Sequence, residues 1–96
     1  TTNSFSKHMA LGTFYDLIVE QTDAYAEAYM CKYGQLKKFP NEYHPPNNDP
    51  VKYFEVLSKF VMDIRKELPQ DSELNQLVDN IQENIDSTLY KLKYLD

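Results

Sequence analysis

Five side chains in the first third of the sequence are of types that bind transition metals. They are His8, Asp16, Glu20, Asp23 and Glu27. A helix turns about 100° per residue, which places all five on one stripe, and carboxylate and imidazole groups suit iron if several converge on one ion. His8 and Asp23 are separated by about 22 Å along a helix axis, so one helix cannot bring both to one metal. A metal site on this stripe therefore requires a second, antiparallel copy.

The same stripe has a plainer interpretation. Acidic residues along a long helix usually form a solvated face, and a single His at the edge of an apolar sector is usually a hydrogen-bonded packing residue. On the wheel His8 lies beside Ala26 and Tyr15, which predicts that it points toward the bundle or toward a subunit interface. The sequence favours the solvated face, with metal binding as the rival interpretation.

No other motif indicates catalysis. The sequence has no glycine-rich phosphate loop, no GxSxG, no HExxH and no paired Cys and His, so hydrolase and nucleotide-binding classes lack support. His44 has no second His or Cys nearby, which predicts an ordinary loop residue. Cys31 is the only cysteine, which excludes an internal disulfide and a multi-thiol zinc site and suits a reducing cytoplasm. We assign no catalytic residue.

Composition limits the size and the partners of the protein. The 96 residues are enough for one domain, 1–96, and the net charge of -5 disfavours nucleic acid. No run of 18 apolar residues is present, so we expect no membrane segment and a cytoplasmic protein, in a bacterium or in the host of a phage. The first residue is Thr1, and we expect that upstream sequence is missing.

The first element is predicted to be a helix over residues 4–33. Apolar and aromatic residues recur there at steps of three and four, and Gly34 follows as a helix stop. The run from 34 to 49 contains three prolines and three asparagines, which is typical of a loop. The recurring residues are Leu11, Phe14, Tyr15, Ile18, Thr22, Tyr25, Tyr29 and Tyr33.

Two further helices are predicted at 50–68 and 72–95. Asp49 as the N-cap and Pro50 at the first helical position begin the second helix, and Pro69 ends it. Asp71 or Ser72 caps the third, whose apolar positions repeat over three heptads. The apolar face of the second helix comprises Tyr53, Phe54, Leu57, Phe60, Val61, Ile64 and Leu68. That of the third comprises Leu74, Val78, Ile81, Ile85, Thr88, Leu92 and Leu95.

The lengths of the two connections predict the topology. The tight link after Pro69 requires the second and third helices to be antiparallel neighbours, whereas the 34–49 loop is long enough to cross the whole bundle. We therefore expect the first and second helices to run in the same direction. A four-helix bundle with such a crossover needs one more helix, which would precede Thr1 or come from a second subunit.

Part of the first helix resembles a known family. The stretch HMALGTFYDLIVEQTDAYAE resembles the second helix of ferritin-like proteins, especially the DNA-protecting ferritins of starved bacteria, where a His precedes an Asp by fifteen residues and a Glu follows four later. Here these are His8, Asp23 and Glu27. The opening SFSKHMALGTFYD and the closing TLYKLKYL also resemble short ferritin-like proteins encoded largely by phages. The resemblance implies an all-α ferritin-like bundle.

The resemblance also implies a di-iron ferroxidase site between two subunits, with iron as the cofactor. In that family the three ligands act with a His on the preceding helix and an Asp four residues after the shared His. This chain has Gly12 four residues after His8, where the family has the Asp. The preceding helix, which would carry the other His, is not in the sequence. The predicted metal site, His8, Asp23 and Glu27, is therefore incomplete, and iron is not established.

Three functions remain open at this point. The preferred one is an oligomeric binding or structural module of phage type that forms a homo-oligomer through the first helix. The second is a di-iron ferroxidase with His8 from one subunit and Asp23 and Glu27 from another. The third is a small acidic inhibitor or adaptor of a host protein. The many tyrosines on the first helix fit either a subunit interface or an aromatic core with hydroxyl groups at its rim.

Overall fold

The computed structural model describes residues 2–35 and 49–94, with side chains described from Phe5 onward. It contains helices α1 (Thr2–Tyr33), α2 (Pro50–Ile64) and α3 (Ser72–Tyr94), and a 3-10 helix, η1 (Arg65–Glu67). The described residues include no strand, so the prediction of an all-α protein is confirmed. Most of the predicted 34–49 crossover, including His44, lies outside the described residues, as does Leu95.

None of the helices in the described ranges is both long enough and apolar enough to cross a membrane.

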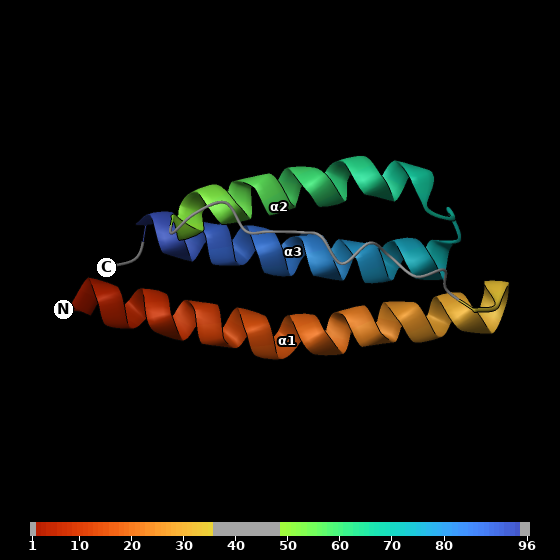
Figure 1. The fold of residues 1–96 in the computed structure, drawn as a ribbon, viewed down its shortest axis with the longest axis horizontal. Helices are drawn as coiled ribbons and strands as arrows, with labels where there is room; N and C mark the ends of the chain where they lie inside the picture. The colour runs from red at the N-terminus through yellow and green to blue at the C-terminus, as the bar shows by residue number, and fades with distance from the viewer. Residues whose placement is uncertain (1, 36–48, 95–96) are drawn as a thin grey trace.

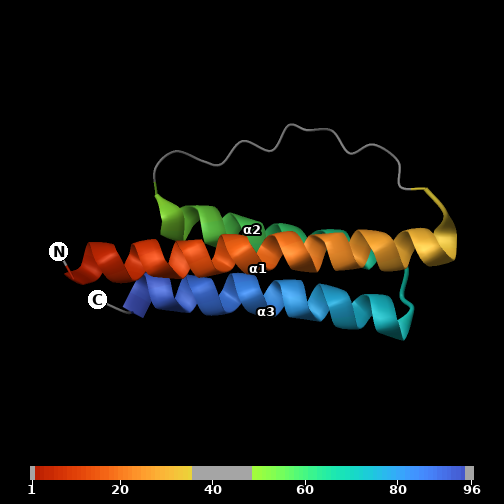
Figure 2. The same ribbon diagram turned by 90° about the horizontal axis from the view of Figure 1, so that it is seen from below.

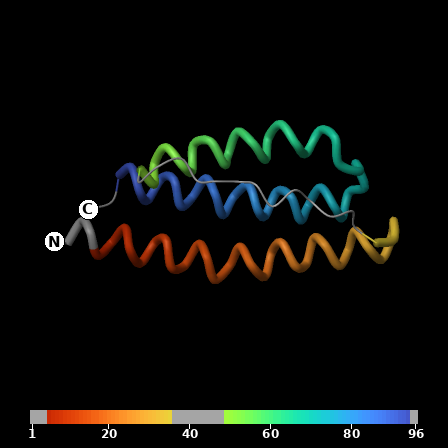
Figure 3. Tube along the Cα trace, in the orientation of Figure 1, coloured from red at the N-terminus to blue at the C-terminus, as the bar shows by residue number. Residues whose placement is uncertain are grey.

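Helices α1 and α2 run in the same direction, and α3 runs opposite to both (Figures 1 and 2). The tube in Figure 3 shows that α1 ends at one end of the bundle and α2 begins at the other. The parallel arrangement predicted from the loop length is therefore confirmed. The start of α1 and the end of α3 lie at the same end of the molecule.

Helix α3 is the central element, because it packs against both α1 and α2. Its predicted heptad pattern matches the core, with Leu74, Ile85 and Leu92 almost completely inaccessible to solvent. Burying each such side chain contributes about 1.5–3 kcal/mol. Phe14 of α1 and Phe54 of α2 meet edge to face with ring centroids 4.7 Å apart, so an aromatic contact joins the two parallel helices.

The buried face of α1 differs from the prediction. Phe14 is buried and Ile18 and Tyr25 are partly buried as expected, but Tyr15, Thr22 and Tyr33 are exposed. The predicted stripe was too wide, because apolar residues occur all around this helix and only a narrow strip contacts α3. That strip also includes Ala10, Gln21 and Ala28, which are buried or partly buried.

Helix ends follow the predicted capping residues. The Asp49 carboxylate accepts hydrogen bonds from the backbone N–H groups of Val51 (3.1 Å) and Lys52 (3.3 Å), which is the N-cap geometry. Gly34 adopts a φ of 85° after the last turn of α1, and its N–H donates to the carbonyl of Met30 at 3.0 Å. Both boundaries are therefore set by local side-chain and backbone chemistry.

The second helix ends earlier than predicted. Its α-helical part stops at Ile64 instead of Leu68, and η1 provides one tighter turn. Leu68 is extended (φ -88°, ψ 163°), because the residue before a proline disfavours the helical region. Gln70 Nε2 donates to the carbonyls of Arg65 (3.0 Å) and Leu68 (2.7 Å), which compensates for lost helical hydrogen bonds.

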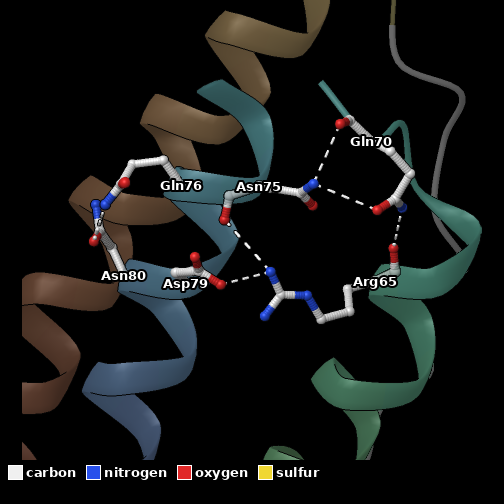
Figure 4. A network of polar contacts seen from close by, with 6 residues as sticks. All are labelled: Arg65, Gln70, Asn75, Gln76, Asp79 and Asn80. Carbon is white, nitrogen blue, oxygen red and sulfur yellow. Dashed lines mark hydrogen bonds and ion pairs between the residues drawn. The ribbon is translucent and has the colours of Figure 1, made fainter. Parts of the chain in front are cut away.

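Polar contacts fix the turn between η1 and α3 (Figure 4). Arg65 Nη2 donates to Asp79 Oδ1 at 2.6 Å and to the Asn75 carbonyl at 3.5 Å. Asn75 Nδ2 donates in turn to the backbone and side-chain oxygens of Gln70. These contacts join η1 and the turn after it to the beginning of α3. They help to hold α2 and α3 antiparallel.

Candidate functional site

The three residues of the predicted metal site are all exposed on α1. His8, Asp23 and Glu27 do not converge within one chain, and no group of three His, Cys, Asp or Glu side chains in the described residues could hold a metal ion. His8 is exposed and does not face the bundle, so the prediction that it points toward the bundle is wrong. The other predicted placement, at a subunit interface, stays a prediction. A site shared between two copies remains a prediction, because it requires a second chain.

The side of α1 that faces away from α3 carries a regular pattern of its own. Eight residues follow one another at alternating steps of four and three, which is the spacing of a coiled-coil contact line. At about 100° per residue, all of them lie within about 60° of the direction opposite Phe14. We call this line the outward seam. It consists of Phe5, Met9, Gly12, Asp16, Val19, Asp23, Ala26 and Met30.

The large apolar members of the outward seam are exposed, whereas Ala26 is partly buried. The exposed fraction is 64% for Phe5, 54% for Met9, 58% for Val19 and 42% for Met30. A Cβ atom added at Gly12 would meet no other atom within 4 Å, so this part of the helix surface is open. Exposed apolar surface rimmed by polar residues is typical of a surface that binds another protein.

The charged members of this face are all acids. Asp16 and Asp23 lie in the outward seam, and Glu20 and Glu27 lie beside it. None of the four forms an ion pair or a hydrogen bond within the described part of the chain. Their charge is therefore directed to solvent or to a partner.

The last turn of α1 is attached to the start of α3 by a separate polar cluster. Lys32 Nζ forms ion pairs with Asp71 (2.8 Å) and Glu73 (3.0 Å), and the Tyr33 hydroxyl donates to Asp71. The hydrogen bonds from Lys32 and Tyr33 hold the pKa of Asp71 below its ordinary value. The hydrogen bonds to the two carboxylates raise the pKa of Lys32. This cluster fixes α1 to α3 and leaves the outward seam free.

A row of tyrosines lies next to this cluster. The Tyr25 and Tyr29 rings are 6.3 Å apart and the Tyr29 and Tyr33 rings 5.3 Å apart, centroid to centroid. The Tyr25 hydroxyl is buried without a hydrogen-bond partner, and its pKa is raised by burial and then by the nearby Tyr29 and Asp71. Within the described chain these rings thus include both a partly buried member, Tyr25, and an exposed one, Tyr33. The buried Tyr25 hydroxyl contradicts the predicted aromatic core in which every hydroxyl lies at the rim, whereas the predicted subunit interface stays a prediction.

One open depression lies between α1 and α3. Its volume is about 180 Å³, below the usual range of small-molecule sites. Asn84, which is buried, donates to Gln21 Oε1 at 3.1 Å, and Gln21 donates to the Asn80 carbonyl at 3.0 Å. This depression is therefore better explained as the surface of a polar helix contact than as a substrate pocket. Its lining comprises Leu17, Gln21, Asn80, Glu83, Asn84 and Ser87.

Sequence reasoning found part of this surface. The acidic stripe was predicted from the sequence, but the second heptad line through Phe5 and Val19 was not, because the line that contains Phe14 is richer in large apolar and aromatic residues. The signal was available in the spacing of Met9, Val19 and Met30. That the acids have no partners in the described chain could only be learned from the structure.

A family model covers nearly the whole sequence. It matches residues 1–92 and is described as a family of unknown function (DUF5856). The chain therefore belongs to this family. A search of curated proteins and a search of solved structures each found no significant match.

Proposed function

We propose that this member of the DUF5856 family is a helical binding module that recognises another protein chain through the outward seam of α1. The observation that carries the proposal is the combination of exposed apolar residues and unpartnered carboxylates on one face of one helix. The opposite face of α1 is already used for packing against α3. The polar cluster at Lys32 holds the helix in place without using any residue of the seam.

A helical surface of this kind fits recognition by a second helix. From Phe5 to Met30 the outward seam is about 37 Å long, and its spacing matches the contact line that a helix presents to a neighbouring helix. Gly12 and Ala26 are small, which allows large side chains of a partner to approach the backbone of α1. Function as a binding module does not require the chain to carry out a reaction.

Site-specific photo-crosslinking tests this proposal. A benzoylphenylalanine at Val19 is compared with one at Tyr90, which is 59% exposed on α3. The chain is expressed in the cells in which it naturally occurs and then irradiated. We expect one discrete, saturable adduct from position 19 that Met30→Glu abolishes, and none from position 90. Equal labelling at both positions, or no adduct at all, would contradict the proposal.

Iron binding between two copies is the second candidate function. His8, Asp23 and Glu27 are all exposed along the same helix, so a second antiparallel copy has access to them. Iron would supply the positive charge that two acidic seams need in order to approach. Iron bound in this way would join two copies into a homo-oligomer through α1. The resemblance also implies a ferritin-like bundle, and the parallel course of α1 and α2 supports that topology.

Titration with ferrous iron under anaerobic conditions separates the two candidates. Iron-dependent dimerisation, followed by sedimentation velocity, and stoichiometric binding that Asp23→Asn removes would favour the second candidate. Asp63→Asn serves as the control, since Asp63 is an exposed carboxylate on α2. A monomer that binds no iron would leave the protein-binding module as the function.

A further inference from the structure

Two carboxylates occupy contact positions of the outward seam. Asp16 and Asp23 are seven residues apart and therefore lie one above the other on the same line as Val19. A helix docked along this line would cover both. An ionised carboxylate that is removed from water without a cationic partner costs several kcal/mol. An entirely apolar partner is therefore a poor fit.

A second copy of the chain is an equally poor fit without an added cation. If two antiparallel α1 helices place Val19 against Val19, each Asp16 lies next to the other copy's Asp23. If they are parallel, each acid faces its own equivalent. Glu20 and Glu27 add further negative charge beside the seam. The lysines of α1 in the described part, Lys7 and Lys32, lie on its inward side. Either alignment brings like charges together.

We propose that the outward seam binds a cationic amphipathic helix that presents Arg or Lys at two contact positions seven residues apart, opposite Asp16 and Asp23. This inference rests on the proposed function and specifies the chemistry of the partner. The apolar residues of the partner would pack on Phe5, Met9 and Met30 at the two ends of the seam. Methionine side chains are flexible and adapt to varied apolar partners, so the two acids provide most of the specificity.

Three synthetic peptides of about four heptads test the inference. They share leucines at the apolar contact positions and differ only at the two central contact positions, which are both Arg, both Gln or both Glu. Affinity is measured by fluorescence anisotropy with the full chain, at concentrations where the peptides are monomeric. We expect the Arg peptide to bind on the order of tenfold to a hundredfold more tightly than the Gln peptide, and the Glu peptide to bind least.

Charge reversal provides the decisive comparison. The double variant Asp16→Lys with Asp23→Lys should prefer the Glu peptide over the Arg peptide. The control, Glu67→Lys with Glu83→Lys, changes the net charge equally at two exposed carboxylates outside the seam, and it should keep the original order of affinities. All four positions are exposed, and circular dichroism checks that the variants stay folded.

Failure of this inference can be distinguished from failure of the proposed function. If the Gln peptide binds as tightly as the Arg peptide, or if the control loses the preference equally, the inference is wrong. If the chain alone is a dimer that Val19→Glu dissociates, the inference is also wrong, although the seam is then still a binding surface. If no peptide binds and position 19 gives no photo-adduct, both proposals are wrong.

Discussion

Asn84 Nδ2 donates to Gln21 Oε1 at 3.1 Å across the contact between α3 and α1, and Asn84 is only 7% exposed. Gln21 extends this polar contact through its hydrogen bond to the Asn80 carbonyl at 3.0 Å. Polar pairs in such positions favour one axial alignment of two helices, because any shift leaves buried amide groups without partners.

Removing the Gln21 side chain should destabilise the protein. In Gln21→Ala the Asn84 amide loses its shortest hydrogen bond, and we expect the free energy of unfolding to fall by about 1–2 kcal/mol. Urea denaturation followed by circular dichroism measures the change. Gln76→Ala, in an exposed part of α3, is the control and should stay within about 0.5 kcal/mol. A smaller effect for Gln21 than for Gln76 would show that the pair does not set the alignment.

The contact between Phe14 and Phe54 predicts a larger loss. Phe54 is 1% exposed, and its truncation to alanine leaves a cavity between the two parallel helices. We expect Phe54→Ala to cost about 3–5 kcal/mol, which is enough to unfold a small domain partly at 37 °C. Val56→Ala on the exposed side of α2 is the control. Equal melting temperatures for the two variants would contradict this assignment of the core.

The two glycines should respond to alanine in opposite ways. Gly12 is in the interior of α1 with open space around it, so Gly12→Ala should stabilise the chain by about 0.5–1 kcal/mol. Gly34 has a positive φ, so Gly34→Ala should destabilise it by about 1 kcal/mol. Thermal unfolding of both variants checks the signs. Destabilisation by Gly12→Ala would indicate that a partner or the chain itself packs closely on the outward seam.

The polar cluster at the end of α1 predicts a dependence of stability on acid. The pKa values of Asp71 and Glu73 are lowered in the folded state by hydrogen bonds from Lys32. A carboxyl whose pKa is lowered on folding stabilises the protein above its unfolded pKa, and this contribution disappears as the pH falls through the folded pKa. Asp71→Asn should therefore lower the urea concentration at the midpoint of unfolding at pH 7. At pH 2 the midpoints of the variant and of the natural chain should be nearly equal. A constant difference between the variant and the natural chain across this range would argue against the cluster.

The sequence predicted α3 better than α1 for a physical reason. Helix α3 is covered on two sides, so its buried positions are many, apolar and regularly spaced, and Leu74, Val78, Ile85 and Leu92 are buried as expected. Helix α1 buries only a strip, in which Ala10 and Gln21 replace large apolar residues. The predicted direction of the helices followed from loop length and proline content, which do not depend on knowing which face of α1 is inward.

The candidate site was predictable only in part. The spacing of the acids showed that Asp16 and Asp23 share a stripe, but the sequence could not show whether bases on neighbouring helices would neutralise them. Lys32 illustrates the difficulty, since it pairs with residues about forty positions away, Asp71 and Glu73. Charge pairing between distant segments depends on tertiary structure, and so does the availability of a surface for binding.

The central place of α3 also affects the order in which the chain unfolds. Contacts between α2 and α3 join residues close in sequence, such as Arg65 and Asp79, 14 apart, whereas Asn84 reaches Phe14, 70 residues away. Closing the longer loop costs more chain entropy, so α2 and α3 should form a hairpin early and α1 should detach first. Native-state hydrogen exchange should then show faster opening of the middle of α1 than of α3. A partner bound along α1 would slow that opening. The rate of hydrogen exchange in α1 would then show whether the partner is bound.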